Sequence, residues 1–237
     1  MANGQVVTGF SKPYVAVYTN DGTDVTYADG QILARGVSVS LDVESSDDNN
    51  FYADNITAET AAGTFTSGSV TLTVDGLKAE AEKLLVGLPD ADDDGFVAYG
   101  ASQQIPYVGV GFVVRVQSGG VVSYVPIVLP KVVFNNPSLE AATQEDEIDW
   151  QTQELEGTIL RDDTTETAWK YRGENFATES LAEAAIKTKL QIAAIFAPTG
   201  GTVIAGGNNF VILDDDGAVA AAQAGGTLQH GFGNIQI

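Results

Sequence analysis

Two segments with strand periodicity, separated by a long acidic stretch, constrain the fold of this chain more than any other feature. Apolar and polar residues alternate from Ile32 to Val43 and again from Val70 to Val74. A side-chain period of two is typical of a strand with one buried and one solvated face. A simple hairpin connection has about two to five residues. We therefore interpret the interval from Glu44 to Thr66 as a long loop that forms a projecting functional arm.

The arm mixes apolar anchors with solvated groups. Phe51, Tyr52 and Ile56 lie among carboxylates and carboxamides, and the interval contains no basic residue. Such a mixture is expected of a segment that docks on another surface. The alternative is a flexible insertion without a partner. The candidate docking residues are Phe51, Tyr52, Ile56, Asp47, Asp48 and Asp54.

The composition restricts the function classes. The 237 residues suffice for one large domain, or for one domain with an appendage, and no cysteine is present. Thirty-two acidic against eleven basic residues give a net charge of -21, which opposes binding to nucleic acid. The charge fits a halophile protein or a wall that repels a polyanion. No apolar run reaches the roughly 20 residues of a membrane helix, and the first residues do not resemble a signal peptide, so we expect assembly in the cytoplasm.

Two acidic clusters invite a metal or catalytic interpretation. Asp90, Asp92, Asp94 and Gly95 match the opening of a calcium loop, but Ala101 stands where the loop needs its bidentate acid. We favour an acidic surface turn and keep a divalent-cation site as the alternative. The acids of the second cluster are neighbours on a polar segment. Acid–base catalysis needs two carboxyl groups whose environments separate their pKa values, and this segment offers no such difference. They are Glu145, Asp146, Glu147 and Asp149.

We expect neither an enzyme nor a bound cofactor. His230 is the sole histidine, and no serine nucleophile motif accompanies it, so it cannot complete a catalytic triad.

The remaining chain predicts further strands and two helices. One helix follows Asp75 as a cap and ends at Gly87; the other follows Thr178. In the second helix we expect four residues to face inward: Leu181, Ala185, Ile186 and Leu190. Expected strands span 6–10, 14–19, 96–100, 107–117 and 121–134, followed by a hairpin of 150–160 with 167–172. Its expected core residues are Trp150, Leu155, Ile159 and Trp169.

The composition changes near residue 195. We expect a β domain over 1–195 and a Gly/Ala-rich extension over 196–237 with a β-hairpin turning at Asp215–Gly217.

Several motifs, taken in order, resemble the phage major tail protein family, the tail tube subunits of long non-contractile tails, in particular those of phages of Gram-positive bacteria. The likeness covers roughly residues 10 to 190 and does not extend beyond residue 195. The motifs are PYVAVY, ARGVSVSLDV, FYADN, SGSVTLTVDGL, GVGFVVRV, YVPIVLPKVVF, ELEGTI, WKYR and ATESLAEAAI.

The resemblance implies a mainly β fold, a β-sandwich or barrel with one or two flanking helices. It implies hexameric rings that stack into a tube, in which two long hairpins of each subunit form an inner β-barrel. The hairpins at 32–76 and 107–134 are the candidates, because long strands with bare edges need a partner. The arm then reaches an adjacent ring or subunit.

A tube of this kind would conduct DNA through its lumen without specific binding and would belong to the virion. The implied partners are further copies of the chain, a tape measure protein inside the tube, a tail terminator and a distal tail protein. An acidic, hydroxyl-rich lining would repel phosphates. The candidate lumen-facing residues are Ser38, Ser40, Asp42, Thr71, Thr73 and Asp75.

Two other functions stay open at this point. One is the tube component of a contractile secretion or bacteriocin machine. The weaker one is a glycan- or calcium-binding β-sandwich domain.

Overall fold

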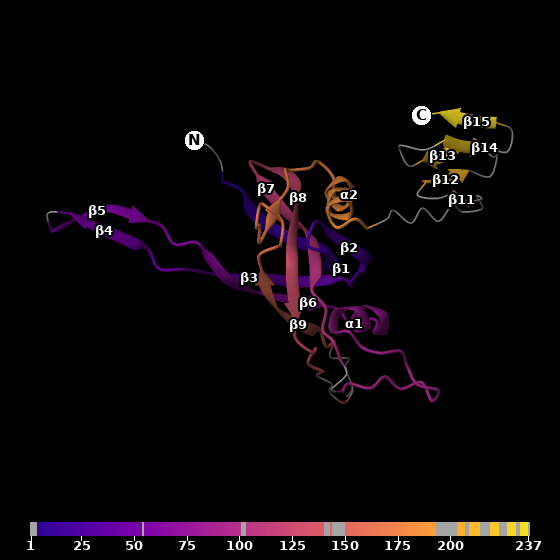
Figure 1. The fold of residues 1–237 in the computed structure, drawn as a ribbon, viewed down its shortest axis with the longest axis horizontal. Coiled ribbons are helices and arrows are strands. Elements are labelled where there is room, and N and C mark those ends of the chain that lie inside the picture. Colours follow the sequence, from indigo (N-terminus) through magenta and orange to yellow (C-terminus); the bar gives the residue numbers. More distant parts are fainter. Residues whose placement is uncertain are drawn as a thin grey trace. The chain divides into compact units, whose positions relative to one another are not determined.

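The computed structural model describes residues 4–53, 55–100, 103–139, 143 and 150–192, together with five strands of the C-terminal part. The chain separates into two compact units, Met1–Ala193 and Ala194–Ile237. Figure 1 shows the elements of both units along the chain. Among the described residues, no helix is long and apolar enough to cross a membrane.

The first unit is built on one antiparallel sheet of eight strands, in the order β2-β1-β7-β8-β9-β6-β3, with β10 paired to β8. The protein is therefore mainly β, as the sequence predicts. The strands are β1 (Val6–Asn20), β2 (Val25–Ile32), β3 (Gly36–Ser45), β6 (Phe65–Val74), β7 (Val108–Ser118), β8 (Val121–Phe134), β9 (Gln153–Leu160) and β10 (Tyr171–Arg172). Although β1 and β3 stand near opposite ends of the order, they contact each other. The sheet therefore curves around its core.

The two faces of the sheet bury separate clusters, as alternation along a strand requires. On the concave side, Val15, Phe112 and Leu129 belong to the larger core, which helix α1 (Ala79–Val86) also joins. On the other side, Tyr14 and Ala16 pack beneath helix α2, together with Val113 and Val128. Neighbouring positions of one strand thus serve different layers.

Helix α2 (Glu179–Lys189) begins as predicted. The backbone N–H of Leu181 donates to Thr178 Oγ1 at 3.4 Å, so Thr178 is the cap. The predicted inward face is only partly right. Ile186 and Leu190 are buried, but Ala182 takes the place of Leu181, which is 53% exposed.

Two glycines of β7 explain the rotation of α2. A side chain at Gly111 would overlap Ile186, and one at Gly109 would overlap Tyr27 and approach Leu190. Because these positions have no side chain, α2 lies close to the sheet, and its residues Ala182 and Ile186 face the sheet. Gly109 and Gly111 therefore serve the packing of α2 on the sheet.

Helix α1 ends as predicted but begins differently. Gly87 adopts the left-handed conformation with φ 63° and caps the C-terminus. The predicted N-cap, Asp75, lies outside the helix. Its carboxylate accepts from the backbone N–H of Arg35 at 2.9 Å and pairs with the Arg35 side chain at 2.7 Å. It therefore secures the start of β3 instead.

Other strand predictions need correction. Residues 6–20 form one strand, because β1 continues through a bulge in which Lys12 has φ 55°. Residues 96–100 form no strand. The predicted hairpin of 150–160 with 167–172 is absent, since β9 pairs with β6 and β8 while β10 pairs with β8. Leu155 and Ile159 are buried and Trp169 is partly buried, whereas Trp150 is 82% exposed.

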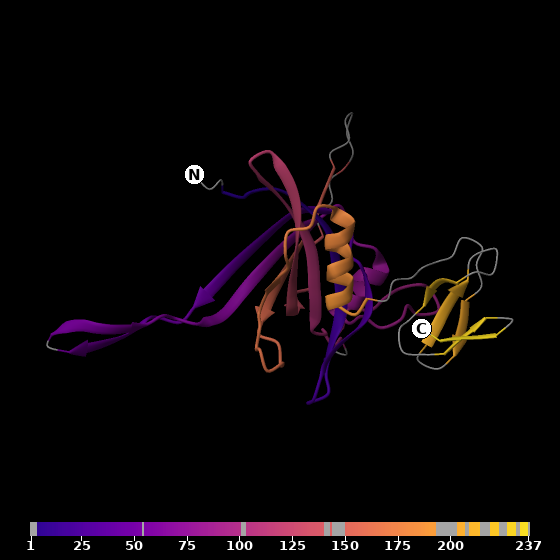
Figure 2. The ribbon, with the colours of Figure 1, turned by 90° about the horizontal axis from the view of Figure 1, so that it is seen from above.

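The interval between β3 and β6 is not a loop. Strands β4 (Asn49–Ala53) and β5 (Ile56–Ala61) pair with each other and prolong the β3–β6 hairpin as a narrow ribbon, which we call the arm. Figures 1 and 2 show the arm leading away from the sheet and from α2. The predicted projection is present, but its backbone is paired.

The second unit contains two small antiparallel sheets. One has the order β11-β12-β13, and the other joins β14 to β15. Strands β12 and β13 flank the predicted turn, whose residues 215–217 lie outside the described part. The bounds are β11 (Val203–Gly206), β12 (Asn209–Leu213), β13 (Val219–Ala222), β14 (Thr227–His230) and β15 (Gly233–Gln236).

A polar cluster around Glu183 fastens α2 to the sheet. The Glu183 carboxylate accepts from Tyr14 Oη at 2.6 Å and pairs with Lys187 at 2.8 Å and Lys12 at 3.5 Å. Burial by itself raises the pKa of Glu183. The hydrogen bonds from Lys187 and Tyr14 and the two positive charges outweigh that effect and lower the pKa to about 2.

Glu183→Gln should lower the free energy of unfolding at pH 7 by about 1.5–3 kcal/mol, the range for hydrogen bonds to a charged group. Because folding lowers this pKa, the carboxylate stabilises the fold fully above pH 4.5, and its contribution is lost as the pH falls toward about 2. Urea unfolding across this window should show a steeper loss for the wild type than for Glu183→Gln. Glu174→Gln, at an exposed position, is the control. Parallel profiles for the wild type and Glu183→Gln would contradict the assignment.

Candidate assembly surfaces

The neck of the arm, where the β3–β6 hairpin continues into the β4–β5 pair, is fixed by hydrogen bonds between the two chain segments. The Ser46 N–H donates to the Thr64 carbonyl at 2.9 Å, and the Thr64 N–H donates to Ser46 Oγ at 3.0 Å. Further along the arm, the Gly63 N–H donates to Asp48 Oδ1 at 2.8 Å. A side chain at Gly63 would overlap the Ser46 carbonyl, so the neck needs glycine here. Asp48 thus has a structural role within the arm.

The register of the arm separates its three predicted anchors. Ala53 pairs with Ile56, and Phe51 lies two residues before Ala53, so Phe51 and Ile56 share one face of the ribbon. Tyr52 projects from the opposite face. All three are 64–67% exposed.

Acidic residues accompany these anchors. Glu59, which the sequence analysis did not single out, lies directly opposite Phe51 on the same face. Asp47 is exposed near the neck, and Asp54 lies outside the described residues. The arm is therefore an apolar and acidic surface, exposed on both faces.

β3 forms an edge of the sheet. Among the described residues it pairs only with β6, from Gly36 opposite Val74 to Ser45 opposite Phe65. Its outward N–H and C=O groups are a template for another strand. Two apolar side chains of β3 are also uncovered, since Val37 is 54% and Val43 43% exposed.

The second predicted hairpin has no such edge. β7 and β8 meet at the expected turn, where Gly119 and Gly120 have positive φ. However, β1 flanks β7, and β9 and β10 flank β8. The prediction of bare edges is thus wrong for 107–134, because strands distant in sequence cover it.

Five of the six predicted lumen residues gather on one face of β3 and β6. Ser38 pairs with Thr73, and Ser40 pairs with Thr71. Ser38 Oγ donates to Thr73 Oγ1 at 2.9 Å. Asp42 lies on the same face, whereas Asp75 lies at its end, bound to Arg35.

The pairing with β9 enlarges this face, which we call the polar face. Across three strands its rows are Ser38–Thr73–Glu154, Ser40–Thr71–Glu156 and Asp42–Ser69–Thr158, followed by Glu44–Ser67. The rows between them are apolar and face the core, such as Val39–Leu72–Leu155. Glu154 and Glu156 were not predicted for this face, although they alternate with Leu155 and Gly157, because nothing local predicts that β9 joins β6.

The calcium-like motif folds as a turn closed by its own backbone. Asp92 Oδ1 accepts from the N–H groups of Asp94 and Phe96, and Asp90 pairs with Lys83. In the described part of the chain, no group of three or more potential ligands is placed to hold a metal ion. The acids 145–147 and 149 lie outside that part.

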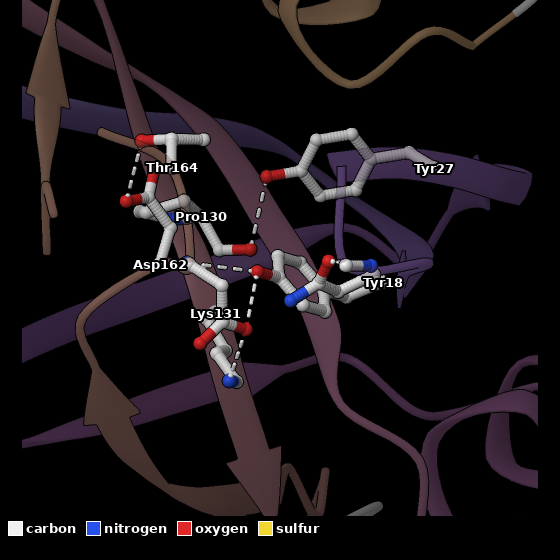
Figure 3. A network of polar contacts seen from close by, with 9 residues as sticks. Tyr18, Tyr27, Pro130, Lys131, Asp162 and Thr164 are labelled. Carbon is white, nitrogen blue, oxygen red and sulfur yellow. Dashed lines mark hydrogen bonds and ion pairs between the residues drawn. The ribbon is translucent and has the colours of Figure 1, made fainter. Parts of the chain in front are cut away.

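The one buried charged side chain in the described core serves the fold. Asp162 accepts from Thr164 Oγ1 at 2.8 Å and from Tyr171 Oη at 2.9 Å. Figure 3 shows it beside Tyr18 and Lys131, both of which bond to Asp163. These contacts fasten the segment after β9 to β1 and β8.

The titration of this network favours a structural role. Burial raises the pKa of Tyr18 to about 12, and Lys131 together with Tyr18 lowers the pKa of Asp163. At neutral pH the phenol is therefore a hydrogen-bond donor and the carboxylate an acceptor. Neither group is tuned for proton transfer near pH 7.

Comparison with known proteins adds no assignment, since no family model and no characterised protein matches this sequence.

Replacing Gly63 with Ala should loosen the neck of the arm, because the new methyl group displaces the Ser46 carbonyl. Hydrogen exchange of amides 46–61 should become at least about tenfold faster, while that of β7 and β8 stays unchanged. Ala62→Ser, at the exposed neighbouring position, should leave both unchanged. Equal protection of the arm in Gly63→Ala and the wild type would refute this account of the neck.

Proposed function

We propose that this protein is a structural subunit that assembles with copies of itself into a hollow tube, as the major tail tube protein of a long, non-contractile phage tail. Hexameric rings stack to form the tube, and the chain performs no chemistry. The observation that carries the proposal is the β3–β6 hairpin. It lies at the edge of the sheet, and it continues into an arm whose apolar side chains are exposed.

The bare edge of β3 supports closure of a ring. A long, exposed edge strand promotes uncontrolled association unless a defined partner covers it. In the ring, a neighbouring subunit pairs with β3, so that the sheets of successive subunits join into an inner β-barrel. Within each subunit, we take the curved sheet with its two helices to correspond to the β-sandwich or barrel of the tail tube fold.

The polar face supports a DNA conduit. Four carboxylates, those of Asp42, Glu44, Glu154 and Glu156, share it with hydroxyl groups. Facing the lumen, they repel phosphates at distances up to about 8–10 Å at physiological salt. The DNA, and before it a tape measure protein, then pass without strong binding. A tail terminator and a distal tail protein close the two ends.

Purified full-length protein at high concentration should form tubes of constant diameter in negative-stain images. Replacing Phe51 and Tyr52 with Ser removes one anchor from each face of the arm, and should leave a folded monomer that forms no tubes. Phe96→Ser, at a residue that is 74% exposed outside the arm, should still form tubes.

Two results would overturn the proposal. One is a wild type that stays monomeric at every concentration tested. The other is tubes of normal length from the double variant.

A further inference from the structure

A groove between α2 and the β8–β10 pair is a second apolar site at which a partner can dock; Pro126 and Val128 in its lining are buried, and Tyr171 and Ala185 are half-buried. It offers about 270 Å³ and is lined by Pro126, Val128, Tyr171 and Ala185, with Arg172 and Lys189 at its rim. An engineered cavity of about 150 Å³ already accepts a benzene-sized ring. The groove is therefore large enough for one aromatic side chain.

Helix α2 extends the apolar wall of this groove. Leu181, Ala185 and Lys189 are spaced four residues apart and form one stripe along the helix. Leu181, which the sequence predicted on the inward face of the helix, is 53% exposed. Leu181 and Ala185 thus add apolar surface beside the groove, and Lys189 adds a positive charge at the end of the stripe.

The rim is positively charged in a strongly acidic chain. Among the described residues, five of the eleven basic residues form ion pairs, and Arg172 and Lys189 are among the six that do not. The Lys189 ammonium lies 3.7 Å from the centre of the Tyr171 ring. Arg172 donates to Gln5, Gly173 and Asn175 at 3.4–3.5 Å. Within the described residues, neither cation has a carboxylate partner.

The arm has the complementary chemistry. Phe51 and Ile56 project from one of its faces, and Glu59 stands opposite Phe51 on that face. From the neck at Ser46 to Asn55 the arm extends about 30 Å at roughly 3.3 Å per residue. It leads away from α2 of its own chain in both views of the fold (Figures 1 and 2). The arm of another copy can therefore reach this groove, while that of the same chain points elsewhere.

We propose that the groove receives the arm of a second copy of this chain, with Phe51 in the apolar cavity and Glu59 beside Lys189 and Arg172. This inference rests on the proposed self-assembly and identifies the surface that accepts the arm. Burial of an aromatic anchor supplies most of the affinity, and the charges set the register.

The absence of cysteine from the chain allows a direct test by disulfide trapping. Asn49→Cys lies on the Phe51 face of the arm, and Ala185→Cys lies in the groove. The two single variants are mixed and oxidised, so that only a contact between chains gives a crosslinked dimer. We expect this dimer to exceed that from Asn49→Cys with Ala184→Cys, an exposed neighbouring position, at least about tenfold.

Charge reversal tests the register independently. Glu59→Lys and Lys189→Glu should each raise the critical concentration for assembly at least about tenfold, because each places like charges together. The two changes combined in one chain should restore assembly. Lys78→Glu makes the same charge change at an exposed site elsewhere and should have no effect.

The outcomes separate this inference from the proposed function. Suppose that wild-type tubes form, but Asn49→Cys gives equal dimer yields with Ala184→Cys and Ala185→Cys, or the double charge reversal does not restore assembly. The groove is then not the receptor of the arm, and the proposed tube assembly still stands. If the wild type forms no tubes and the mixed cysteine variants give no crosslinked dimer, the proposed function fails as well.

Discussion

The antiparallel pairing of β3 with β6 is the interaction on which the rest of the structure depends. This pairing forms one end of the sheet and places the polar residues on one face and the core residues on the other. The same hairpin continues into the arm. It also leaves the outer backbone groups of β3 without a strand partner among the described residues. Among the described residues, β2 at the other end of the sheet likewise pairs with one strand only, and open edges of this kind allow ordered association when a defined partner covers them.

The negative charge of the chain is compatible with the proposed assembly because the groove that would receive the acidic arm is bordered by cations. The net charge of -21 keeps separate copies soluble. Carboxylates line the polar face and accompany the anchors of the arm, whereas the apolar groove beside α2 carries two cations at its rim. The proposed docking of the arm in the groove would therefore bring opposite charges together and leave the polar faces apart and hydrated.

Local periodicity predicted what a single strand or helix determines by itself. The alternation in 32–43 and 70–74 identified the positions of β3 and β6 and assigned Ser38, Ser40 and Thr71 to one face, and Thr178 and Gly87 marked helix ends. Pairing between strands distant in sequence could not be predicted this way. The place of Glu154 and Glu156 on the polar face was therefore missed, as were the strands that flank the 107–134 hairpin. The arm looked like a loop because its strands are short and polar. Leu181 was misplaced because Gly109 and Gly111 set the rotation of α2 from across the interface.

Hydrogen exchange measured on dilute monomer and on concentrated protein tests the central claim most directly. If sister copies cover the β3 edge and the arm, amides of Gly36–Ser45 and Asn49–Ala61 should gain protection on concentration, while those of the central strands β7 and β8 stay equally protected in both samples. Unchanged exchange at β3 and the arm in an assembled sample would contradict the account.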